Sequence, residues 1–125
     1  MRSHLALVVL AMLTPACVPA WELIGERDVA FRQERDEIQT TMDGRFRRIV
    51  LEVGESDIEL LDVHVELADG AAIDVPVRRR IVAGTRTSVI EFPGGAHVVH
   101  DVQLTYRTDT RLANGRAHVY IYGQR

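Results

Sequence analysis

The chain has 125 residues, a hydrophobic fraction of 46% and a formal net charge of −3 at pH 7. This length has room for one domain, and this hydrophobic fraction argues against an intrinsically disordered protein. All 15 basic residues are arginines scattered along the chain, and acidic residues outnumber them. That balance argues against a non-specific nucleic-acid binder, which needs a basic stripe.

The first residues of the chain are typical of a cleavable signal peptide. Arg2 and His4 form a short polar start, and a continuous apolar run follows over 5–13. Such a run suits the apolar core of a signal peptide but is too short to span a bilayer. Small residues at Val18 and Ala20 favour cleavage before Trp21. We therefore predict a signal peptide over 1–20, a single domain over 21–125 and export to the periplasm or the cell exterior, with no transmembrane span in the mature protein.

Cys17 leaves a second interpretation open. It is the only cysteine of the chain, and it follows the apolar run closely. A lipid on Cys17 would tether the domain to a membrane surface without spanning the bilayer. The residues Thr14 to Ala16 match a lipoprotein motif poorly, because Leu13 stands one place too early. Lipidation of Cys17 is therefore the less favoured alternative.

Short runs of alternating apolar residues, separated by turn signals, fill the rest of the chain. This pattern is typical of an antiparallel sandwich or barrel. We predict an all-β domain, an antiparallel β-sandwich or jelly-roll-like fold of about seven or eight strands. The expected polar loop, with a short helical turn as an alternative, lies over 31–44, and the expected strands lie over 21–29, 45–53, 58–67, 73–77, 88–92, 98–106 and 117–122.

Local features refine this strand map. The apolar residues of 58–67 change from even to odd positions, which predicts a β-bulge near Leu61 and Asp62. The dipeptide Asp69-Gly70 predicts a hairpin with a type I′ turn. Pro76 has no backbone donor, so we expect its strand at a sheet edge or the residue at a non-bonded site.

Two groups of side chains are candidates for ligand binding. His118, Tyr120 and Tyr122 share one parity of the last expected strand, so they should form an aromatic row on one face. Such rows stack on sugar rings or bases, although these residues also cover strand edges or complete a second buried face. Arg78 and Arg80 could bind a carboxylate or phosphate through their planar donor forks. The alternative for these arginines is strand-end charge with one structural ion pair.

No residue pattern identifies a catalytic or metal-binding site. His97 and His100 are three residues apart, which places them on opposite faces of a strand. Ser56 and Ser88 lack the glycine context of a hydrolase nucleophile, and no glycine-rich nucleotide-binding motif is present. We therefore predict no catalytic residue, no metal, no cofactor and no enzymatic activity. A small envelope hydrolase or carbohydrate-processing accessory stays as the alternative, because paired carboxylates leave no recognisable motif.

A set of stretches spans nearly all of the expected mature domain: Trp21–Gly25, Asp36–Ile38, Phe46–Ile49, Gly84–Phe92, Val98–Tyr106 and Ala117–Gly123. This set resembles a family of small, uncharacterised exported bacterial proteins, a domain-of-unknown-function family. The resemblance implies a β-sandwich and supplies no catalytic residue. The lack of a catalytic residue set and the expected compact, exported β architecture predict a non-enzymatic binding or structural module, whose partner is a small ligand or an envelope protein.

Overall fold

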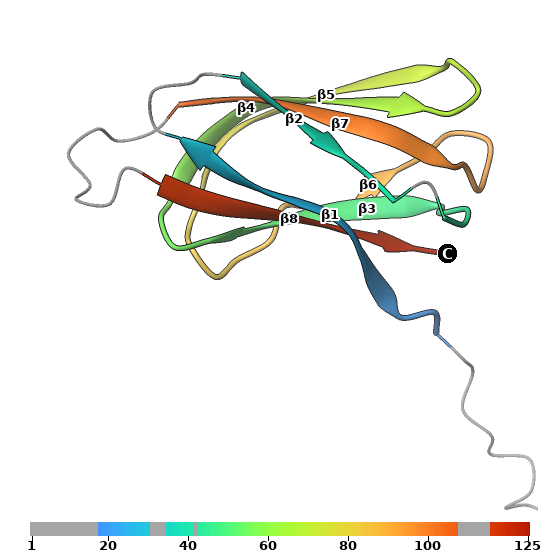
Figure 1. Cartoon of the computed structure of the whole chain (residues 1–125), viewed down its shortest axis with the longest axis horizontal. Coiled ribbons are helices and arrows are strands. Elements are labelled where there is room, and N and C mark those ends of the chain that lie inside the picture. The colour runs from blue at the N-terminus through green and yellow to red at the C-terminus, as the bar shows by residue number, and fades with distance from the viewer. Residues whose placement is uncertain (1–17, 31–34, 42, 108–115) are drawn as a thin grey trace, which may run out of the picture.

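The chain folds into two antiparallel four-stranded sheets that lie face to face (Figure 1). The structure, a computed structural model, describes residues 18–30, 35–41, 43–107 and 116–125. Sheet A has the strand order β1-β8-β3-β6, and sheet B has the order β2-β7-β4-β5. The strands are β1 (Trp21–Ala30), β2 (Arg35–Gln39), β3 (Arg48–Gly54), β4 (Ile58–Leu67), β5 (Ala72–Ile81), β6 (Ile90–Glu91), β7 (Val99–Arg107) and β8 (Arg116–Gln124). The predicted all-β antiparallel sandwich is confirmed.

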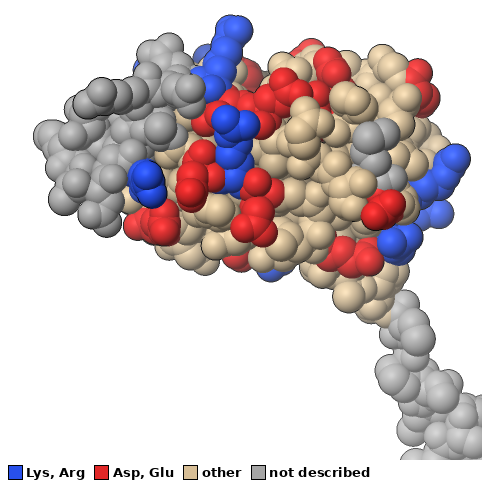
Figure 2. Space-filling view, viewed as in Figure 1, with Lys and Arg blue, Asp and Glu red and all other residues tan. Residues whose placement is uncertain are grey.

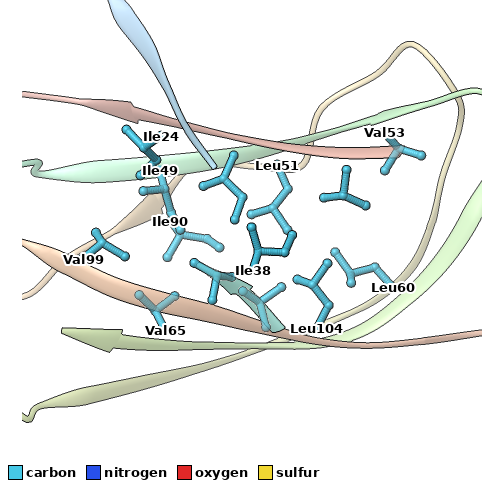
Figure 3. Packing of buried hydrophobic residues seen from close by; sticks show 14 of the residues in the cluster. Ile24, Ile38, Ile49, Leu51, Val53, Leu60, Val65, Ile90, Val99 and Leu104 are labelled. Carbon is cyan, nitrogen blue, oxygen red and sulfur yellow. The ribbon is translucent and has the colours of Figure 1, made fainter. Parts of the chain in front are cut away.

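The hydrophobic core fills the space between the two sheets. Figure 3 shows Leu51 and Val53 of sheet A lying opposite Leu60 and Leu104 of sheet B. Each fully buried side chain of this size stabilises the fold by about 1.5–3 kcal/mol. Successive side chains of a strand point to opposite faces, so the residues that alternate with this core lie on the outer faces of the sandwich.

The predicted bulge in β4 is confirmed. The pairing of β4 with both neighbours shifts register between Leu60 and Asp62. This shift moves Val63 onto the face that Leu60 already occupies, and both side chains are fully buried. Pro76 lies on β5, the edge strand of sheet B, and pairs with Asp62 of β4. An edge strand is one of the two positions expected for a residue without a backbone donor.

The turn at Asp69-Gly70 forms the expected hairpin between β4 and β5, but it is not a type I′ turn. Gly70 has a φ of 93°, whereas Asp69 has no positive φ. The Gly70 N–H donates to the Leu67 carbonyl at 3.0 Å, and the Ala71 N–H donates to the Asp69 carboxylate at 2.9 Å. These bonds correspond to a type I turn that is followed by a glycine in the left-handed backbone conformation. The Asp69 side chain stabilises the turn through its bond to the Ala71 N–H.

The segment expected as a loop over 31–44 contains strand β2, so that expectation was wrong. Asp36 and Ile38 point into the sandwich and are buried, while their neighbours Arg35, Glu37 and Gln39 are exposed. The alternation is therefore present, but one of its two inward residues is charged. A hydrophobicity pattern cannot identify a strand whose buried face contains a carboxylate.

The predicted signal peptide lies almost wholly outside the described residues. Cys17 is among the residues that are not described, and residues 18–20 precede β1 without regular structure. Within the described part of the chain, no helix has the length and apolar character needed to cross a membrane. Signal cleavage and lipidation of Cys17 therefore stay predictions.

Candidate functional site

His118, Tyr120 and Tyr122 form a row along the outer face of β8. The ring centroids of His118 and Tyr120 are 4.5 Å apart, and those of Tyr120 and Tyr122 are 6.4 Å apart with an interplanar angle of 30°. All three side chains are half-buried. Because β8 lies between β1 and β3, the row crosses the middle of sheet A and not its edge. The geometry expected from residue parity is therefore present, while ligand binding at the row stays a prediction.

Carboxylates of β1 hold the His118 ring at one end of the aromatic row. The Nδ1 atom lies 2.5 Å from Asp28 Oδ1, and the Nε2 atom lies 3.1 Å from Glu26 Oε1. Burial opposes the charge of the ring, but the hydrogen bonds to Asp28 and Glu26 outweigh it and raise the pKa of His118. Both ring nitrogens can donate only in the protonated imidazole, so this geometry favours the imidazolium.

Arg86 lies at the other end of the aromatic row. Its guanidinium carbon is 4.7 Å from the centroid of the Tyr122 ring, a cation–π contact. Its Nε atom is 3.0 Å from Glu52 Oε1, and Glu52 is the β3 residue opposite Tyr120. Charged groups that can exchange hydrogen bonds with a ligand therefore flank the rings at both ends.

Arg78 and Arg80 are on β5 of sheet B and do not join the aromatic row. Arg80 donates to Asp57 Oδ2 from Nη2 at 2.6 Å and from Nε at 3.0 Å. The other oxygen of Asp57 accepts the Ala83 N–H at 2.8 Å. This arrangement corresponds to the structural ion pair that was the alternative for these arginines. Arg78 is exposed and adopts a φ of 49° beside the bulge.

A shallow polar depression of ≈ 570 Å³ lies on the outer face of sheet B. His64 is its central titratable group, with Nδ1 2.5 Å from Asp74 Oδ1 and Nε2 3.5 Å from Glu66 Oε1. The hydrogen bond to Asp74 raises the pKa of His64. Figure 2 shows carboxylate side chains interspersed with arginines on the side of the sandwich where β1 and β2 lie. The depression is lined by Arg35, Asp36, Glu37, Asp62, His64, Asp74, Gln103, Leu104 and Thr105.

Glu66, His100 and Asp101 form a cluster beside this depression that the sequence pattern did not predict. One potential metal-ligating atom of each lies within 4.8 Å of the others. His97 does not take part, since its Nε2 atom lies 2.8 Å from the Pro93 carbonyl oxygen. The sequence contains no spacing signal for this cluster, because β4 and β7 bring its members together only in the folded sheet.

The Glu37 carboxyl lies against that of Asp101. Its hydrogen bond with Asp101 and the negative charge there raise the pKa of Glu37. Outer-face carboxylates of β2, β7 and β4 are therefore crowded together at this point of sheet B.

These features define a small antiparallel β-sandwich with an aromatic row on one outer face and an acidic, histidine-containing face on the other. The model of a domain-of-unknown-function family, DUF2541, matches residues 4–123, so the chain belongs to this family. The resemblance found in the sequence is thereby confirmed. The match begins within the predicted signal peptide. No sequence match to a curated protein was found.

The solved structure of AlgX from Pseudomonas aeruginosa has a similar fold. The TM-score is 0.55 at 11% sequence identity, over 83% of this chain. The chain spans only 27% of the length of that AlgX chain. An identity this low shows a likeness of fold alone.

Proposed function

We propose that the chain is an exported, non-catalytic β-sandwich module that binds an uncharged saccharide on the aromatic row of sheet A. The observation that carries this proposal is the near-parallel pair of Tyr120 and Tyr122 on the middle strand of an outer sheet face. Half-buried aromatic side chains on an outer sheet face suit the apolar faces of sugar rings. The surrounding carboxylates accept hydrogen bonds from hydroxyl groups, and Arg86 donates them.

Charge narrows the class of ligand. Glu26 and Asp28 lie at the His118 end of the row, and Glu52 lies beside Tyr120. These carboxylates repel phosphates and other anions, which disfavours nucleic acid as the stacked ligand. A neutral sugar is not repelled in this way, and its hydroxyl groups can donate further hydrogen bonds to the carboxylate oxygens.

A hydrolase at the depression on sheet B is the second candidate, because His64 lies there with carboxylates. Both nitrogens of its ring face acidic groups, Asp74 and Glu66, and the raised pKa favours the protonated ring. A protonated imidazole cannot act as a general base. No serine or cysteine lines the described depression as a nucleophile. These observations favour binding over catalysis.

A binding screen with variants of the row tests the proposal. The purified protein should bind one class of neutral glycan on an array, and Tyr120→Ala and Tyr122→Ala should each weaken the affinity. Losing one stacked ring costs about 0.5–1.5 kcal/mol, or about two- to tenfold in Kd. Tyr120→Phe and Tyr122→Phe keep the rings and serve as matched controls. Two results would overturn the proposal: alanine variants that bind the glycan as tightly as wild type, or a measured enzymatic turnover of a substrate that a point mutation abolishes.

Mass spectrometry of the mature N-terminus tests the export part of the proposal. A chain that begins at Trp21 supports soluble export. An acylated N-terminal Cys17 would replace it with a lipid-anchored module. An intact Met1 in the exporting host would refute both.

A further inference from the structure

An unpartnered carboxylate oxygen is buried on the outer face of sheet B. Asp101 is only 3% exposed, although it belongs to the outward parity of β7 with Gln103 and Thr105. Its Oδ1 atom has no hydrogen-bond partner among the residues that the structure describes. An ionised oxygen that is buried without a donor or a cation costs free energy, so such an atom indicates a missing partner.

Strand pairing and a β-bulge bring two further ligand groups to the Asp101 carboxylate. Glu66 pairs with Asp101, whereas the next residue, Leu67, pairs with Val99. His100 is therefore the extra residue of the bulge, and a bulge redirects a side chain from the face that alternation assigns to it. The His100 Nδ1 atom lies 3.4 Å from Asp101 Oδ2, and a ligating atom of Glu66 lies within 4.8 Å of both groups.

We propose that Glu66, His100 and Asp101 bind a divalent cation of the Zn²⁺ class. Carboxylate oxygen and imidazole nitrogen together are ligands of zinc and related transition metals, whereas Ca²⁺ and Mg²⁺ are bound through oxygen atoms. Three protein ligands leave a coordination position for water or for a group of a partner. Asp101 is the buried member of the site, whereas Glu66 is half-buried and His100 is exposed.

Glu37 supplies the competing explanation for the buried oxygen. Its carboxyl lies within hydrogen-bonding reach of the Asp101 carboxyl. A proton shared by Glu37 and Asp101 would satisfy Asp101 without any metal. The His64 Nε2 atom also lies 3.5 Å from Glu66 Oε1, so His64 competes with a cation for the Glu66 carboxylate. The two explanations differ in whether the protein binds a cation through Glu66 and His100.

Isothermal titration of the full protein, stripped with a chelator, tests the proposal with Zn²⁺, Ca²⁺ and Mg²⁺ as separate probes. Wild-type protein should bind a single Zn²⁺ more tightly than either of the other ions. His100→Ala and Glu66→Gln should each weaken Zn²⁺ binding at least about tenfold, because the first removes a direct ligand and the second removes the negative charge of another. Both residues are solvent-accessible, so these variants should keep the fold, and circular dichroism checks this.

Glu59→Gln is the matched control for Glu66→Gln, because Glu59 is an exposed carboxylate on the same strand. It should leave Zn²⁺ binding unchanged. His118→Gln tests whether the ion binds instead between Glu26 and Asp28 on sheet A. Absence of Zn²⁺ binding by wild-type protein would favour the shared proton and overturn the proposal. Loss of binding in His118→Gln, or unchanged binding in His100→Ala and Glu66→Gln, would overturn it as well.

Discussion

The Tyr106 hydroxyl donates a 2.8 Å hydrogen bond to Asp36 Oδ2 inside the sandwich. The other oxygen of Asp36 lies 3.0 Å from Arg27 Nε. Arg27 belongs to β1 of sheet A, whereas Asp36 and Tyr106 belong to β2 and β7 of sheet B. The Asp36 carboxylate therefore links the two sheets at the edge where β1 and β2 meet. Burial and the nearby Asp36 raise the pKa of Tyr106, which keeps its hydroxyl protonated as a donor.

Tyr106→Phe should lower the free energy of unfolding. The substitution removes the donor from a buried carboxylate, and a hydrogen bond to a charged group contributes about 1.5–3 kcal/mol. Urea denaturation followed by circular dichroism measures the change. Tyr122→Phe removes a hydroxyl at the half-buried surface and should change stability by less than about 0.5 kcal/mol. Equal stability of Tyr106→Phe and wild type would mean that the bond to Asp36 contributes nothing net.

The stability of the fold should depend on pH through His118. The folded-state pKa of His118 is raised above its unfolded value of about 6.5, so the protonated ring is favoured by folding. The stabilisation is complete below the unfolded pKa and is lost as the pH rises through the folded pKa. As the pH rises from below the unfolded pKa through the folded pKa, the urea midpoint of unfolding should fall more steeply for wild type than for His118→Gln. Parallel pH profiles of the two proteins would contradict the contribution of His118.

Gly123→Ala should destabilise the protein because Phe46 occupies the space of the new methyl group. A Cβ at position 123 would lie 2.7 Å from Phe46 Cδ1, and Phe46 is itself buried. Overpacking of this kind costs about 1–3 kcal/mol. Gly54→Ala is the matched control in the same sheet, since its Cβ would meet Tyr120 at an ordinary 3.4 Å. Thermal unfolding should lower the Tm of the first variant clearly more than that of the second.

Thr87→Val should weaken the attachment of the 84–92 segment to β3. The Thr87 hydroxyl accepts the Leu51 N–H at 3.1 Å, and the Thr87 N–H donates to the Leu51 carbonyl at 2.8 Å. Valine keeps the shape but removes the acceptor for a buried N–H, at a cost of about 1–3 kcal/mol. Amide hydrogen exchange should show reduced protection of Leu51. Thr87→Ser retains the hydroxyl and should restore protection; if it does not, the hydroxyl is not the cause.

Features that depend on residues adjacent in the sequence could be predicted, whereas features that depend on pairing between strands could not. The parity change around Asp62 predicted the bulge, and the missing donor of Pro76 predicted an edge strand or a non-bonded site, because both are local properties of one strand. Strand β2 was missed because Asp36 occupies an inward position where a pattern search expects an apolar residue. The type of the Asp69-Gly70 turn was also missed, since the dipeptide suits more than one hairpin geometry.

The all-β class, the antiparallel sandwich and the common face of His118, Tyr120 and Tyr122 could be predicted from the residue pattern, because side chains alternate between the two faces of every strand. The family was predicted from a resemblance of several stretches, and the family match confirms it. The link that Asp36 makes between the two sheets, and the meeting of Glu66, His100 and Asp101 on sheet B, appear only in the folded structure. Alternation specifies which face of a strand is buried, whereas strand order, register and bulges determine which distant side chains come into contact.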